Sequence, residues 1–238
     1  MPEPRLEGPT HEHSIDGDWN IVLVVIGVAF VAAGAFAFVK TQEGYRSLNA
    51  LSAAQNVKLS YNQDGQLVDR GETTGAAAIM SLLKDDWGYP VVAGDLNPDD
   101  PIVNTPTEYM FQMATIAHHT LTGTQTVVLT EPVDYNGTTY AAGTYEVAVD
   151  GRYFSDFDRL NPIDGPARDQ AWSGTAHALI AELGVGTTTA SALQLALVMA
   201  GLMGGLGATL ILTGGGLVWA TRPEKVTVPV LKPAMMPA

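Results

Sequence analysis

The chain has 238 residues, with 25 acidic side chains against 12 basic ones, a net charge of −13 and no cysteine. An acidic exterior repels phosphate backbones, which excludes nucleic acid as an expected partner. The lack of cysteine excludes disulfides, thiolate metal sites and cysteine nucleophiles.

The first 18 residues are rich in proline, glutamate and glycine and have no periodic apolar pattern. We therefore expect residues 1–18 to form a flexible acidic arm. His11 and His13 flank Glu12 in this arm, and they are the nearest approach to a local metal cluster in the sequence. In a mobile segment such a cluster would bind a metal only weakly.

A first apolar segment follows, with 19 uncharged residues at 21–39. As a helix it would be ~28 Å long, close to the hydrocarbon thickness of a bilayer. Trp19 precedes it at the position of an interfacial aromatic anchor. The preceding segment holds five acids and one arginine, which is the wrong charge for a signal peptide. The sequence thus predicts an uncleaved transmembrane helix over residues 19–39.

Residues 40–189 are numerous enough for one domain with its own core. The apolar spacing predicts an α+β domain of about three helices around a small antiparallel sheet. The expected helices are 73–84, 107–121 and 164–183, the last ended by the glycines at 184–186, with a separate short helix over 41–55. The expected strands are 57–61 and a hairpin of 126–130 with 145–149, with Asn136-Gly137 in its connection.

A second apolar segment covers 190–220, 31 residues without a charge, followed by a tail at 221–238. It predicts a second transmembrane helix, because a helix satisfies its own backbone in lipid. Four basic residues flank the two spans on the side of the termini and two on the side of the domain. The positive-inside rule then predicts a two-pass plasma-membrane protein with cytoplasmic termini and an extracytoplasmic domain.

Small residues recur in both apolar segments at the four-residue spacing that lets helices approach closely. The predicted helix-packing residues are Gly201, Gly204, Gly205 and Ala208 in the second segment and Ala29 and Ala33 in the first. Two interpretations stay open: the two spans of this chain pack on each other, or they offer a face to a foreign subunit. Neither segment contains an ionisable residue, which argues against an ion or proton pathway.

The candidate chemistry is sparse. His118 and His119 fall near the end of the expected helix 107–121, and they are the alternative candidates for a metal site. A stable site needs three or four ligands and the local sequence supplies two, so we expect a role at the helix end and no cofactor. No paired carboxylates, nucleophile elbow, phosphate loop or dinucleotide fingerprint occurs, so we expect no catalytic residues.

The order of parts resembles an actinobacterial family of two-span integral membrane proteins, often labelled "aromatic ring-opening dioxygenase". The resembling stretches are 27–39 with 41–56, the segment 116–120 with Thr122-Gly123, and 192–220. The chain departs from the family in its hairpin region 125–154 and in its Pro-Met tail. The resemblance implies a small exterior domain between two spans and assigns no functional residue. Ring opening does not follow from it, because two histidines do not make an iron site.

These observations predict a non-catalytic accessory or assembly subunit of a larger membrane complex. Its expected partners are membrane lipid and other integral membrane subunits. The alternative is an extracytoplasmic domain on a membrane anchor that senses a ligand or a metal ion.

Overall fold

The computed structural model describes residues 15–222, and these form two compact units. One unit, here called the paired-helix unit, holds the described residues up to Lys40 and from Ala196 onward. The other, the globular unit, is Thr41–Leu195. The predicted arm 1–18 and tail 221–238 lie outside the described residues, apart from 15–18 and 221–222.

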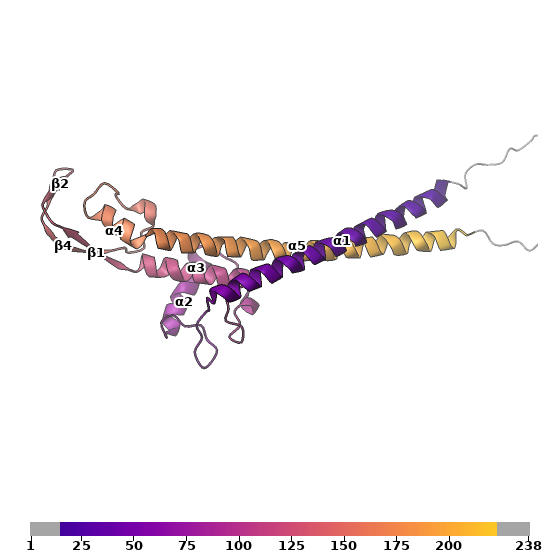
Figure 1. Cartoon of the computed structure of the whole chain (residues 1–238), viewed down its shortest axis with the longest axis horizontal. Helices are drawn as coiled ribbons and strands as arrows, with labels where there is room; N and C mark the ends of the chain where they lie inside the picture. The colour runs from indigo at the N-terminus through magenta and orange to yellow at the C-terminus, as the bar shows by residue number, and fades with distance from the viewer. Residues whose placement is uncertain (1–14, 223–238) are drawn as a thin grey trace, which may run out of the picture. The chain divides into compact units, whose positions relative to one another are not determined.

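Two long helices supply both halves of the paired-helix unit and extend into the globular unit (Figure 1). Helix α1 covers Ile15–Gln55 and helix α5 covers Gly174–Ala220. The expected separate helix at 41–55 is therefore wrong, because α1 continues through Lys40 without a break. Helix α1 ends where Asn56 takes a positive φ of 52°, a common conformation for the residue after a helix.

The glycines at 184–186 do not end a helix, contrary to the prediction, and α5 runs through them. Their role is packing. A Cβ on Gly186 would lie 2.5 Å from the ring of Tyr109 on the neighbouring helix α3, Pro106–Leu121. Glycine at 186 thus lets α5 approach the aromatic ring, which a larger residue would prevent.

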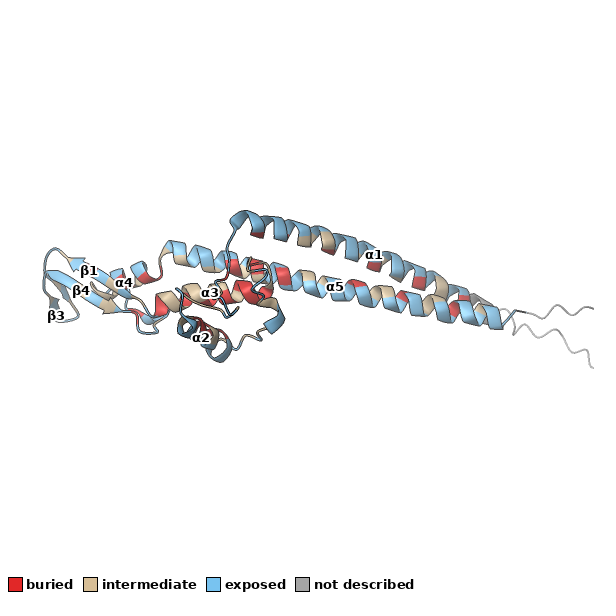
Figure 2. Cartoon of the chain, turned by 90° about the horizontal axis from the view of Figure 1, so that it is seen from below, coloured by how far each residue is buried: buried red, intermediate tan, exposed pale blue. Residues whose placement is uncertain are grey.

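In the paired-helix unit the contacts between α1 and α5 recur every seven residues. Asn20, Gly27 and Gly34 are buried on α1, and Ala200, Gly207 and Gly214 are buried on α5. Figure 2 shows isolated red bands on these helices, which are otherwise largely exposed. A seven-residue repeat is the spacing of left-handed coiled-coil packing.

The globular unit is organised around α3. Pro106 opens the helix, and Thr105 and Glu108 form a capping box on its first turn. Helix α2, Thr73–Ser81, contacts α3, and a π-helical turn, Leu82–Asp86 (η2), extends from it. The core residues Ile79, Leu83 and Ala114 are fully buried here. The predicted helices 73–84 and 107–121 are thus present, with the first one shorter.

Within residues 15–222, four strands make two short antiparallel ribbons. Strands β1, Thr124–Leu129, and β4, Gly143–Ala148, pair from Thr124↔Ala148 to Leu129↔Gly143. Strands β2, Val133–Tyr135, and β3, Thr138–Tyr140, form a second ribbon inside the β1–β4 connection. Asn136 and Gly137 join them with φ of 48° and 79°, as a type I′ turn requires.

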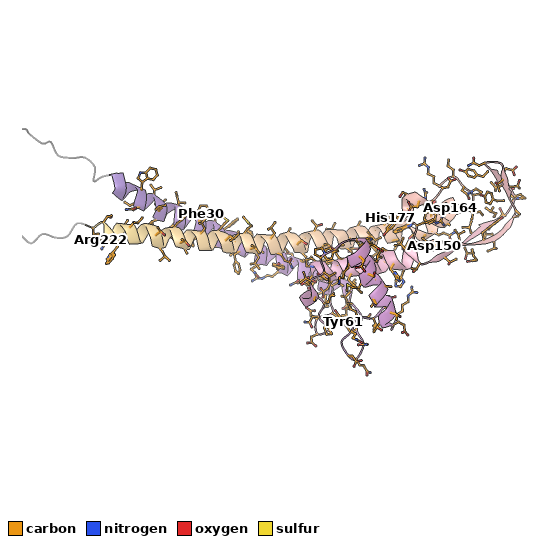
Figure 3. All side chains as sticks on the ribbon, turned by 180° about the vertical axis from the view of Figure 1, so that it is seen from behind. Phe30, Tyr61, Asp150, Asp164, His177 and Arg222 are labelled. Atoms are coloured by element: carbon orange, nitrogen blue, oxygen red, sulfur yellow. The ribbon has the colours of Figure 1, made fainter. Side chains whose placement is uncertain are left out.

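Two further expectations differ from the structure. The helix predicted at 164–183 is broken after α4, Asp164–Ala171, because Trp172 leaves helical geometry and Ser173 caps the start of α5. The side chain of Asp164, which lies beside the ribbons in Figure 3, accepts hydrogen bonds from Arg152 and from the backbone of Asp158. The segment 57–61 makes isolated bridges through Lys58 and Tyr61 and no strand.

Candidate functional site

The closest approach in the paired-helix unit involves the backbones of α1 and α5. A Cβ on Gly27 would lie 2.7 Å from the carbonyl oxygen of Gly207, and a Cβ on Gly207 would lie 2.6 Å from that of Gly27. A Cβ on Gly34 would meet the backbone of Ala200 and Gly204 at 2.9 Å. Only glycine fits at Gly27, Gly34 and Gly207 without moving a backbone.

Of the residues predicted for helix packing, Gly204 takes part in this contact through its backbone. A Cβ on Gly201 or Gly205 would meet nothing within 4 Å. Ala208 and Ala29 are exposed, and Ala33 is half-buried. The contact within the chain thus falls mainly on other glycines, and packing of the exposed residues on a foreign subunit stays a prediction.

The globular unit contains an apolar cavity of about 850 Å³, here called the helix cavity. This volume lies within the range of small-molecule sites. Fifteen residues line it: Gly44, Ser47, Leu48, Leu51 and Gln55 of α1; Val57; Tyr109, Gln112 and Ile116 of α3; and Leu179, Glu182, Leu183, Val185, Gly186 and Thr189 of α5. Most of the larger side chains among them are apolar. The cavity is thus suited to a hydrophobic molecule.

Several large apolar side chains in the helix cavity are incompletely covered by protein. Leu51 is 56% exposed, Leu179 42% and Val185 66%. Such a concentration of exposed apolar surface marks interaction sites and ligand grooves. The helix cavity therefore offers hydrophobic contact area that the described residues do not fill.

The lining also includes polar side chains, namely those of Ser47, Gln55, Tyr109, Gln112, Glu182 and Thr189. Glu182 is the one charged side chain among the lining residues, and the amide of Gln55 donates a hydrogen bond to it across α1 and α5. Tyr109 pairs its hydroxyl with that of buried Ser52 at 2.8 Å. Gln55 and Glu182 thus engage each other at one edge of the cavity, and the remaining large side chains of the lining are mostly apolar.

A buried acid lies at the start of α3. The carboxylate of Glu108, 1% exposed, accepts hydrogen bonds from the backbones of Asn104 and Thr105 and from the Thr105 hydroxyl. Burial raises the pKa of Glu108 despite these donors. Burial, and secondarily the charge of Glu108, raises the pKa of Tyr61, whose buried hydroxyl has no hydrogen-bond partner among the described residues. Tyr61 is labelled in Figure 3.

The predicted histidine pair lies in the last turn of α3, as expected, with ring centroids 5.7 Å apart. His119 binds the carboxylate of Asp69 at 2.9 Å, a partner that sequence spacing did not suggest. Burial, followed by the charge of His119, lowers the pKa of His118. Within residues 15–222, no group of three or more potential metal ligands converges.

His177 lies far along the chain from that pair and in different surroundings. It stands in the first turn of α5, where Figure 3 labels it, and its ring meets that of Phe154 edge-on at 5.2 Å. Trp172, just before α5, has its ring centroid 6.1 Å away. The structure thus brings His177 to an aromatic cluster and not to His118 and His119.

The helix cavity is not predicted by the sequence. Its lining residues come from separate segments between residues 44 and 189, and each segment by itself has the pattern of an apolar helix face. The one local signal is Gly184-Val185-Gly186, which predicts a helix end by its sequence and marks a close approach within α5 in the structure.

No protein-family model, no curated protein and no solved structure matches this chain. Family membership therefore remains a prediction drawn from the resembling stretches, and the site has to be interpreted from its own geometry.

Proposed function

We propose that the chain is a two-pass membrane protein whose globular unit binds a hydrophobic, lipid-like ligand in the helix cavity. The observation that carries this proposal is the apolar cavity of about 850 Å³ among α1, α3 and α5. This function is the ligand-binding alternative of the sequence analysis, with the ligand now restricted by the chemistry of the lining.

Membrane insertion is supported by the character of α1 and α5. Both helices are long and apolar enough to cross a bilayer, and in each only 11% of the most apolar stretch is buried. The core helix of a water-soluble protein would have most of such a stretch covered. In lipid, exposed apolar side chains such as those of Val25, Leu202 and Leu212 contact hydrocarbon and not water, so their exposure carries no hydrophobic cost.

The helices that contribute the lining residues support a lipid-like occupant. The lining parts of α1 and α5 belong to the same unbroken helices as the apolar segments 21–39 and 190–220. Burying a hydrocarbon chain against them would contribute roughly 0.8 kcal/mol per methylene. Glu182, the single charged lining residue, disfavours an acidic group at that edge of the cavity.

Native mass measurement of the protein extracted in mild detergent tests this proposal. We expect the wild type to retain a lipid-mass adduct and the Leu179→Glu variant to lose it, because a charge in the cavity opposes hydrocarbon. Leu160→Glu is the matched control, since Leu160 is 70% exposed and does not line the cavity. A wild type that is always free of adduct, or equal retention by both variants, would contradict the proposal.

A second candidate function is that of an accessory subunit, and a separate observation favours it. Gly201, Gly205, Gly215 and Gly216 are exposed on α5, and a Cβ placed on any of them would meet no described atom within 4 Å beyond its chain neighbours and the adjacent backbone of its own helix. Each glycine costs a helix interior about 1 kcal/mol relative to alanine. Close packing of a partner helix against these glycines would offset this cost.

Copurification tests this second candidate. We expect Gly201→Ile combined with Gly205→Ile to release a copurifying membrane protein that the wild type retains. Leu206→Ile, a near-isosteric change at an exposed position of the same helix, is the control. A wild type that purifies as a monodisperse monomer with no copurifying protein would overturn the accessory-subunit function.

A further inference from the structure

A second hollow in the globular unit, here called the aromatic pocket, has a volume of about 520 Å³ and walls made largely of rings. Trp87 follows η2, and Tyr153 and Phe154 lie at the start of a 3-10 turn, Phe154–Asp156 (η4). Trp172 and His177 come from the junction of α4 and α5. Five rings from three separate segments thus face one space, which shares no lining residue with the helix cavity.

Hydrogen bonds and stacking hold these rings in place. The indole NH of Trp87 donates to the hydroxyl of Tyr153 at 3.0 Å, and that of Trp172 donates to the carbonyl of Arg152 at 3.1 Å. The rings of Tyr153 and Trp172 stack with centroids 5.7 Å apart and an interplanar angle of 21°. A ligand would therefore meet a wall that is already ordered, which lowers the entropic cost of binding.

Part of this aromatic surface is left uncovered. Tyr153 is 40% exposed and Phe154 is 44% exposed, although both are large apolar rings. Ring pairs gain stabilisation beyond simple area burial when they stack offset or meet edge-on. A flat ring is thus the shape that uses this surface best.

The charges around the pocket favour some ring compounds over others. No carboxylate is among its lining residues, and the guanidinium of Arg168 lies 4.5 Å from the centroid of the Phe154 ring. This guanidinium already occupies a cation–π position, and its charge repels a second cation. Its ion pair is with Asp169, a side chain that is 65% exposed, where screening makes such pairs weak.

We propose that the aromatic pocket binds a small aromatic-ring compound that is uncharged or carries a carboxylate. The ring stacks on the exposed surface of Tyr153 and Phe154, and the acidic group, where present, faces Arg168. This site is independent of the ligand in the helix cavity, so either proposal can fail while the other stands.

Tryptophan fluorescence tests this proposal in the full-length protein. The chain has four tryptophans, and Trp87 and Trp172 line the pocket. Trp19 and Trp219 are 66% and 74% exposed in the paired-helix unit, so a Trp19→Phe, Trp219→Phe background leaves only the pocket tryptophans. We expect saturable changes on titration with benzyl alcohol and phenylacetate, and weaker binding of benzylamine.

Variants of Phe154 separate stacking from packing. We expect Phe154→Leu, which keeps apolar bulk but removes the ring, to weaken phenylacetate binding by about tenfold, near the upper end for one ring contact. Phe38→Ala, at a ring 49% exposed in the paired-helix unit, is a control that should leave binding unchanged. Binding that is unaffected by Phe154→Leu would overturn the proposal.

The ligand series decides the class of compound. Tightest binding of benzylamine would mean a cation site and would overturn the proposal. Response to methyl glucoside, with none to the phenyl compounds, would mean a sugar site and would overturn it equally. Ligand-observed NMR on the wild type repeats the series without any substitution, and the absence of a signal from every ring compound would also contradict it.

Discussion

Gly27 of α1 and Gly207 of α5 each occupy the space where a side chain on the other would lie. A Cβ on either residue would come within 2.7 Å of the partner's carbonyl oxygen, a distance that requires the backbone to move. The two helices of the paired-helix unit are therefore held at a separation that only glycine permits at these positions.

We predict that Gly27→Ala and Gly207→Ala each destabilise the paired-helix unit by about 1–3 kcal/mol, the usual cost of overpacking. Thermal unfolding in detergent, followed by circular dichroism, measures this change. Gly201→Ala and Gly205→Ala are matched controls, because an added methyl meets nothing there and alanine favours a helix. Equal losses of stability at all four positions would contradict the assignment of a glycine-dependent contact at Gly27 and Gly207.

The sequence predicts a glycine-rich packing segment and one residue of the contact, Gly204, but not the glycines at 27, 34 and 207. The sequence contains both glycines at four-residue spacing, such as Gly201 and Gly205, and glycines at seven-residue spacing, such as Gly27 and Gly34. Nothing in the sequence alone favours one spacing over the other as the contact. Which of the two series is buried depends on how each helix is rotated about its own axis relative to its partner, and composition does not encode that rotation.

Helix boundaries show the same limit in the globular unit. Helix α4 ends because Trp172 leaves helical geometry, and α5 begins where the Ser173 hydroxyl accepts a hydrogen bond from the backbone of Ala176, although the apolar spacing runs through both residues. Conversely, Gly186 lies inside α5, and its lack of a side chain leaves room for the ring of Tyr109. Local propensity predicted the elements themselves, including α3 and the Asn136-Gly137 turn, because their caps and turn residues act locally.

We predict that Glu108 makes stability depend on pH. Its pKa in the folded protein is raised by burial, so its contribution is fully present below the pKa of an unfolded glutamate and is lost as the pH rises through the folded value. Glu108→Gln keeps an acceptor for the backbone donors and removes the titration. The variant should therefore gain stability relative to the wild type as the pH rises through this window.

Glu108→Ala is the control for the capping interaction. It also removes the titration, and it should cost about 1–2 kcal/mol relative to Glu108→Gln at every pH, because the capping box of α3 loses one partner. Unfolding followed by near-ultraviolet circular dichroism from acid to neutral pH distinguishes the two effects. A difference between Gln and wild type that stays constant with pH would contradict the assigned ionisation.

We predict that the histidine pair holds no stoichiometric metal. His119 is engaged by Asp69, and two imidazoles with one carboxylate do not converge into a ligand set within residues 15–222. Elemental analysis of the purified full chain should find copper, zinc and iron well below one equivalent. One equivalent of metal that disappears in the His118→Ala, His119→Ala double variant would contradict this.

We predict that both termini are cytoplasmic and that residues 40–189 lie outside. Because the chain has no cysteine, single cysteines introduced at Asn136 and at Ala234 can be compared directly. An impermeant maleimide applied to intact cells should label the cysteine at Asn136 and not the one at Ala234. The reverse pattern would invert the topology.

Photocrosslinking with a diazirine-bearing, uncharged long-chain alcohol tests the central claim, a lipid-like ligand in the helix cavity, most directly. We expect labelling within 44–55 and 179–189, where the lining residues of α1 and α5 lie, and we expect excess unlabelled long-chain alcohol to suppress it. Labelling within 21–39 and 196–220, from bulk lipid, should not saturate. Labelling of the cavity segments that is absent, or that excess long-chain alcohol does not reduce, would contradict the claim.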